Sequence, residues 1–178
     1  QGVVDAYTTY QKWASDAKYT VGGADGTVNT KFLDAIYKVF SNPPEAMMVK
    51  QSGFAGGSIA GQFPALKYGT DYDFFAFPGA QGLQGGADFM YAFSNKPAAK
   101  ALVAYLTGTV GAQNWAKANF SLSPNKNADG NYTDPQSIKL SKILSSATGF
   151  TFDIGDAIGA PFNDAEFKGV VKVVQGAD

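Results

Sequence analysis

The chain has 178 residues, 45% of them apolar and 14% aromatic, which is enough for a hydrophobic core and excludes wholesale disorder. It contains no cysteine and no histidine, which excludes disulfides, catalytic triads that use these residues and the usual zinc sites. All 14 basic residues are lysines and the formal net charge is −1, so a nucleic-acid surface is not expected and a neutral ligand is favoured.

The first half of the chain is predicted to contain helices and two short strands. Apolar residues at helical spacing predict helices at residues 3–17 and 30–40, and Pro43 ends the second of them. Residues 46–49 are almost wholly apolar, as in an internal strand of a covered sheet. A brief helix follows to about residue 63. Residues 73–77 are the next predicted strand.

The second half begins with a glycine-rich loop, residues 79–88, and a predicted strand at 89–93. Helices are predicted at 96–106, 110–119 and 135–147, the third opened by Asp134-Pro135. Residues 163–166 have capping-box spacing and open a last helix. Short strands alternating with helices predict an α/β fold, with helices on both faces of a central sheet. No apolar run approaches the roughly 20 residues that span a bilayer, and no signal peptide is recognised.

Two glycine turns are candidate ligand sites, because ligands of open α/β sheets bind beyond the carboxyl ends of strands. Gly53-Phe54 follows the predicted strand at 46–49. The loop from Gly79 leads to Asp88 and lacks the Gly-Lys-Ser/Thr of a phosphate cradle. Close approach of its backbone to a ligand is one interpretation, and a simple turn is the other.

Carboxylates and loop aromatics complete the candidate chemistry. Asp71/Asp73 and Asp153/Asp156 are too sparse for a calcium site and are expected to be solvated or to cap helices. A glycosidase needs a pair of acids, which the sequence permits without fixing their separation. Four phenylalanines lie at glycine turns, where aromatic faces can stack on sugars: Phe54, Phe150, Phe152 and Phe162.

Several stretches resemble the solute-binding proteins of bacterial ABC sugar transporters, more narrowly their α-glucoside-binding members. They are NPPEAMMVKQSGFAGG at 42–57, YDFFAFPG at 72–79, GGADFM at 85–90, the helical run at 96–115 and SPNK at 123–126. The resemblance implies a two-lobed α/β receptor that closes on an α-glucoside or similar oligosaccharide. Such a receptor delivers its sugar to a membrane permease, without catalysis, cofactor or metal. It implies a periplasmic or extracellular location, as a soluble protein or a lipoprotein.

The resemblance also implies site residues. Gly53 and Phe54 fall where the family places ligand contacts after a strand, and an aromatic there commonly stacks on the sugar. Gly86 and Asp88 fall at a hinge-crossing loop that commonly hydrogen-bonds sugar hydroxyls. Phe162 and Asn163 fall near a late aromatic contact.

The chain departs from the family in its length, since members run to roughly twice this length or more. Residues 1–178 are expected to form a single compact unit, the C-terminal part of a two-lobed protein, and residues 86–123 to cross to the other lobe. The missing lobe, or a second copy of the chain, would then complete the cleft. Two alternative functions stay open: a self-associating interaction module derived from such a lobe, and a glycoside-processing enzyme.

Overall fold

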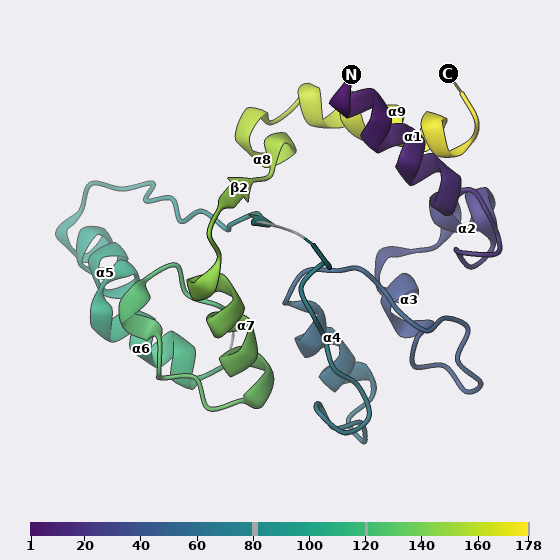
Figure 1. Ribbon diagram of the computed structural model, residues 1–178. Helices are drawn as coiled ribbons and strands as arrows, with labels where there is room; N and C mark the ends of the chain where they lie inside the picture. Colours follow the sequence, from purple (N-terminus) through teal and green to yellow (C-terminus); the bar gives the residue numbers. More distant parts are fainter. Residues whose placement is uncertain (80–81, 120, 178) are drawn as a thin grey trace. The chain divides into compact units, whose positions relative to one another are not determined.

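The computed structural model describes residues 1–79, 82–119 and 121–177, and the chain divides into two compact units (Figure 1). Unit 1 comprises Gln1–Gln51 and Asp153–Asp178, and unit 2 comprises Ser52–Phe152. Residues 80 and 81 of the predicted glycine-rich loop lie outside the described residues. No helix of the described ranges is both long enough and apolar enough to cross a membrane. The assignment of residues 1–178 to one C-terminal part of a two-lobed protein stays a prediction.

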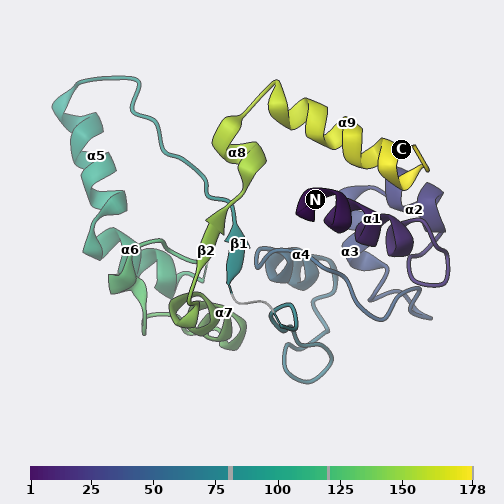
Figure 2. The same ribbon diagram turned by 45° about the horizontal axis from the view of Figure 1, so that its top comes forward.

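Unit 1 is a small helical assembly. Its helices are α1 (Gly2–Ala14), α2 (Gly23–Asn29), α3 (Phe32–Tyr37), α8 (Ile154–Ile158) and α9 (Phe162–Val174). The two long helices, α1 and α9, pack against each other (Figure 2). The side-chain amide of Gln11 donates to the carbonyl of Val173 at 2.6 Å and joins them. Ala14 and Val174 are buried in this unit, as is Ile36 of α3.

Unit 2 contains the remaining elements. They are α4 (Ala55–Gln62), β1 (Leu83–Gly85), α5 (Pro97–Thr107), α6 (Thr109–Lys117), the 3-10 helix η1 (Lys126–Ala128), α7 (Pro135–Ser146) and β2 (Phe150–Phe152). Its core is formed by Ala112, Ala116, Ala128 and Tyr132, with Leu122 and Ile138 packed against them. The predicted start of α7 is confirmed, because Asp134 accepts a hydrogen bond from the amide of Ser137 at 2.8 Å and Pro135 is the first helical residue.

The described residues contain one sheet, of two parallel strands. Leu83 of β1 pairs with Phe150 of β2, and Gly85 pairs with Phe152. The described part of the chain is therefore mostly helical. The α/β composition is present only in this small sheet, and a central sheet with helices on both faces is not seen in the described residues.

The three predicted strands at 46–49, 73–77 and 89–93 are not strands in the structure. Each is an apolar run, a pattern typical of a strand that is covered on both faces. A strand also needs a neighbour to receive its backbone hydrogen bonds. In the described residues no strand pairs with these segments, and large apolar side chains in each are exposed, among them Met47, Phe75 and Phe93.

The capping box predicted at residues 163–166 is also wrong. Helix α9 begins at Phe162 and its N-cap is Pro161, two residues before the predicted cap Asn163, with no side-chain hydrogen bond. Asn163 therefore lies inside the first turn, where its backbone amide donates to the carbonyl of Gly159 at 3.1 Å. Instead of the predicted side-chain cap, the structure has a backbone hydrogen bond from the first turn of α9 to Gly159 at the end of α8.

Candidate functional site

The turn that carries Gly53 and Phe54 rests directly on α7. A Cβ atom at Gly53 would lie 3.0 Å from Cδ1 of Leu140, and one at Gly56 would lie 1.8 Å from Nε2 of Gln136. The glycines thus allow a contact between α4 and α7 that larger residues would obstruct. Phe54 stands between these two contacts as the N-cap residue of α4, and its side chain is 50% exposed. The backbone of the turn places an aromatic ring at the surface.

Gly86 and Asp88 lie just beyond the carboxyl end of β1. Gly86 directly follows the strand, and Asp88 is an exposed residue of the extended segment that leads to α5. The ring centroid of Phe89 lies 6.1 Å from that of Phe152, the last residue of β2. This ring contact ties the extended segment to the small sheet next to Asp88. The carboxyl edge of a parallel sheet is a common ligand position.

Phe162 and Asn163 belong to unit 1, whereas the other four predicted residues belong to unit 2. Phe162 begins α9 and is 38% exposed. Asn163 packs against α8: a Cβ atom at Gly155 would lie 2.5 Å from its Oδ1. Within unit 1 the structure therefore brings these two residues to the junction of α8 and α9. The role of all six residues in ligand binding stays a prediction.

The predictions for the two aspartate pairs have different outcomes. Asp153 caps α8, since one carboxylate oxygen accepts from the amides of Gly155 at 2.9 Å and Asp156 at 3.3 Å, and this prediction is confirmed. Asp73 neither caps a helix nor is merely solvated, because it forms an ion pair with Lys139 of α7. The described residues contain no group of three or more acidic side chains placed to hold a metal ion.

Asp73 is the centre of a cluster that sequence reasoning missed. The Lys139 ammonium lies 2.8 Å from each of its carboxylate oxygens and 2.6 Å from the carbonyl of Phe74. The same ammonium lies 4.8 Å from the ring centroid of Phe74. The Tyr68 hydroxyl donates to Asp73 at 2.7 Å. No local pattern signals this cluster, because its two charged members are 66 positions apart.

The cluster perturbs two ionisable groups. The hydrogen bond from Lys139, followed by those from Tyr68 and the Phe74 amide, lowers the pKa of Asp73 to about 2. Burial, with the hydrogen bond to Asp73 as the next cause, raises the pKa of Tyr68 to about 12. At neutral pH both effects keep a charged carboxylate bonded to a neutral phenol. The cluster holds the loop at 67–74 against α7.

Two curated proteins are similar to this chain. It is 30% identical over 183 aligned positions to the osmoprotective compounds-binding protein GgtB of Synechocystis sp., a match that covers 99% of this chain and 42% of that protein. It is 28% identical over 184 positions to the alpha-glucosides-binding periplasmic protein AglE of Rhizobium meliloti, covering 98% of this chain and 39% of that protein. The chain therefore spans about two fifths of the length of these relatives. No family model and no solved structure matches it.

The two matches confirm the resemblance read from the sequence. The chain is distantly homologous to two binding proteins, one named for osmoprotective compounds and the other for alpha-glucosides. The alignment covers both units, because it extends over nearly every residue.

Proposed function

Since the chain is a distant homologue of two solute-binding proteins, we propose that it is part of the substrate-binding component of an ABC sugar importer. It binds an α-glucoside or similar oligosaccharide between two lobes and performs no catalysis. The observation that carries this proposal is the match to a binding protein over 99% of the chain. The name of the second relative, an alpha-glucosides-binding periplasmic protein, supports the class of sugar and a periplasmic location.

The half-exposed ring of Phe54 supports a stacking contact in this function. A sugar presents C–H groups on the faces of its ring and hydroxyls at its edges, so a rigid aromatic face is a suitable partner for it. The glycine turn fixes the backbone around Phe54 against α7, which lowers the entropic cost of holding the ring in one position. Asp88 supplies a carboxylate that accepts hydrogen bonds from sugar hydroxyls. Phe162, which is 38% exposed, and Asn163 are further proposed contact residues.

The segment at 86–123 crosses to a further lobe in this proposal. Its first residues are extended and apolar, with Phe89, Tyr91 and Phe93 at alternate positions and 63%, 71% and 97% exposed. Alternate positions of an extended chain lie on one face. An exposed apolar face of this kind is typical of a surface that another element covers. The same exposure favours a second candidate function, self-association of the chain through this face.

Native mass spectrometry with a mixed pool of α-linked di- and trisaccharides tests the proposal. We expect one sugar adduct and no product of cleavage. Phe54→Ala should weaken binding by about 5- to 150-fold, which corresponds to the cost of about 1–3 kcal/mol typical of a lost aromatic contact. Phe75→Ala, which changes another exposed phenylalanine of unit 2, is the matched control and should bind like the parent.

Three results would each contradict a different part of the proposal. A folded chain that binds no sugar at millimolar concentration would contradict sugar binding by this part of the protein. Binding that is equally strong in the Phe54→Ala variant would contradict the proposed contact only. Release of a shorter sugar would replace the receptor proposal by a glycoside-processing enzyme.

A further inference from the structure

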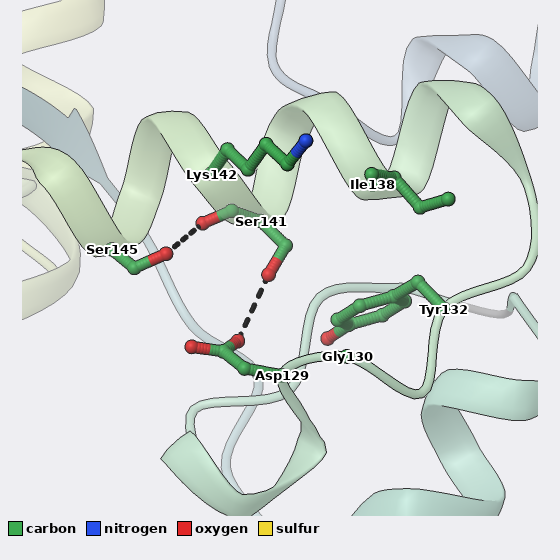
Figure 3. A pocket seen from close by; sticks show the side chains of 7 residues that line it. All are labelled: Asp129, Gly130, Tyr132, Ile138, Ser141, Lys142 and Ser145. Atoms are coloured by element: carbon green, nitrogen blue, oxygen red, sulfur yellow. Dashed lines mark hydrogen bonds between the residues drawn. The ribbon is translucent and has the colours of Figure 1, made fainter.

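A second candidate site lies within unit 2, between the loop that follows η1 and the face of α7 that carries Ile138, Ser141 and Ser145. A cavity of about 150 Å³ is present there (Figure 3). Its lining consists of Asp129, Gly130 and Tyr132 from the loop and Ile138, Ser141, Lys142 and Ser145 from α7. None of these is among the residues assigned to the proposed function, so this inference does not depend on it.

The cavity exists because small residues face each other across it. Ser141 and Ser145 are one helical turn apart on α7 and therefore lie on the same face. Opposite them is Gly130, with a φ of 78° and no heavy atom within 4 Å of the position that a Cβ would occupy. The Ser141 hydroxyl donates to Asp129 Oδ1 at 2.9 Å and connects the two walls. The Ser145 hydroxyl donates to the carbonyl of Ser141.

The apolar part of the lining is fixed by the core. Tyr132 is only 6% exposed and belongs to the buried cluster of unit 2, against which Ile138 packs. The Tyr132 hydroxyl accepts a hydrogen bond from the amide of Ser123 at 2.8 Å, which fixes the orientation of the ring. The cavity is thus formed before any ligand enters, and a preformed site avoids the cost of ordering its walls.

The polar groups of the lining select a class of ligand. Asp129 is a carboxylate with acceptor capacity beyond its bond to Ser141, whereas the ammonium of Lys142 is directed away from Asp129 (Figure 3). The negative charge of Asp129 disfavours an anionic ligand. The hydroxyls of Ser141 and Ser145 already donate their protons within the protein, so toward a ligand their oxygens act as acceptors. Acceptor oxygens beside the apolar side chains of Tyr132 and Ile138 match a molecule that carries several hydroxyls and no negative charge.

We propose that this cavity binds a small neutral polyol, between glycerol and a single sugar ring in size. The volume supports this limit, since about 150 Å³ is well below the roughly 300–1,000 Å³ of sites for drug-sized ligands. The polyol hydroxyls donate to the carboxylate of Asp129 and to the hydroxyl oxygens of Ser141 and Ser145. Its C–H groups contact Tyr132 and Ile138.

Titration of the ¹⁵N-labelled chain with glycerol and with D-glucose tests the proposal. We expect saturable shifts of backbone amide signals that are confined to residues 129–145. Ser145→Leu places a larger side chain in the cavity and should abolish these shifts. Ser146→Leu changes the neighbouring exposed residue of α7, which does not line the cavity, and should leave them unchanged.

Asp129→Asn is a second test that keeps an oxygen for the Ser141 hydroxyl and removes the negative charge. It should weaken binding about tenfold, as expected when a hydrogen bond to a charged group is lost. Shifts that rise linearly without saturation, or that are equal in Ser145→Leu and Ser146→Leu, would overturn the proposal. So would an unchanged affinity of the Asp129→Asn variant, which decides the matter if Ser145→Leu does not fold. Shifts confined to the residues around Phe54 would support the proposed function and contradict this site.

Discussion

The ammonium of Lys139 lies 2.8 Å from both carboxylate oxygens of Asp73, although 66 positions separate the two residues. This ion pair holds the loop at 67–74 against α7. The same helix contacts the turn of Gly53 and Gly56 through Leu140 and Gln136, and the loop after η1 through Ser141. Helix α7 is therefore the scaffold on which three loops of unit 2 are positioned.

The low pKa of Asp73 predicts a specific acid sensitivity. This pKa is about 2 in the folded chain, against 3.8 for the unperturbed group. A lowered pKa stabilises the folded state above the unfolded value, and this stabilisation is lost as the pH falls through the folded value. We expect the stability difference between the parent and Asp73→Asn to shrink from about pH 4 to about pH 2. Urea unfolding followed by circular dichroism measures it, and a difference that stays constant over this window would contradict the ion pair.

Tyr68 should show the opposite dependence at high pH. Its pKa is about 12 in the folded chain, against 10.0 for the unperturbed group. A raised pKa stabilises the folded state fully below pH 10, and the contribution is lost as the pH rises towards 12. A titration of tyrosinate absorbance should contain a component near pH 12 that is absent from Tyr68→Phe. Asp73→Asn should move this component to lower pH, and an unmoved component would show that the hydrogen bond has no part in the shift.

The positions of helices were largely predictable from the sequence. Asp134-Pro135 predicts the start of α7 because a carboxylate accepts the free amides of a first turn and proline lacks one. These are local interactions, so they depend on residues that are neighbours in the chain. Helix α9 could not be placed in this way, because its N-cap is Pro161 and no side chain caps its first turn.

Strands and the Asp73 cluster could not be predicted in the same way. The apolar run at 89–93 is typical of a buried strand. Whether it forms one depends on a partner strand elsewhere in the chain, which the run itself does not indicate. The ion pair of Asp73 and Lys139 also joins distant segments, so no local sequence pattern predicts it. The turn of Gly53 and Phe54 was found because it combines glycines with an aromatic, whereas its support by Gln136 and Leu140 required the structure.

Gly111 is expected to be a position where alanine is not tolerated. A Cβ atom there would lie 2.1 Å from the carbonyl oxygen of Tyr105, which is backbone and cannot turn aside. Gly111→Ala should force α5 and α6 apart and lower the free energy of unfolding by about 1–3 kcal/mol. Gly57→Ala is the matched control in a helix of the same unit, with no atom within 4 Å of its Cβ position. It should be neutral or stabilising by up to about 1 kcal/mol. Equal effects in denaturant unfolding would contradict this packing.

Gly56 and Gln136 should be energetically coupled. A Cβ at Gly56 would overlap the end of the Gln136 side chain, which is flexible and can move away at a cost. Gly56→Ala should therefore be less favourable in the parent than in a Gln136→Ala background. Contacting residues in double-mutant cycles typically differ from additivity by about 0.5–3 kcal/mol. Strict additivity would mean that α4 and α7 do not meet at this turn, and would remove the support inferred for Phe54.

The exposed face of Phe89, Tyr91 and Phe93 should control self-association of the isolated chain. Phe93 is 97% exposed, so Phe93→Ser removes apolar surface without opening a cavity in the core. Such surface changes usually alter stability by less than about 0.5 kcal/mol. Sedimentation velocity should show a concentration-dependent mass for the parent and a smaller one for Phe93→Ser. Val3→Ser, which changes an exposed residue of α1, is the control and should associate like the parent. If Phe93→Ser associates as strongly as the parent, this face is not the contact surface, and its proposed coverage by a further lobe loses its support.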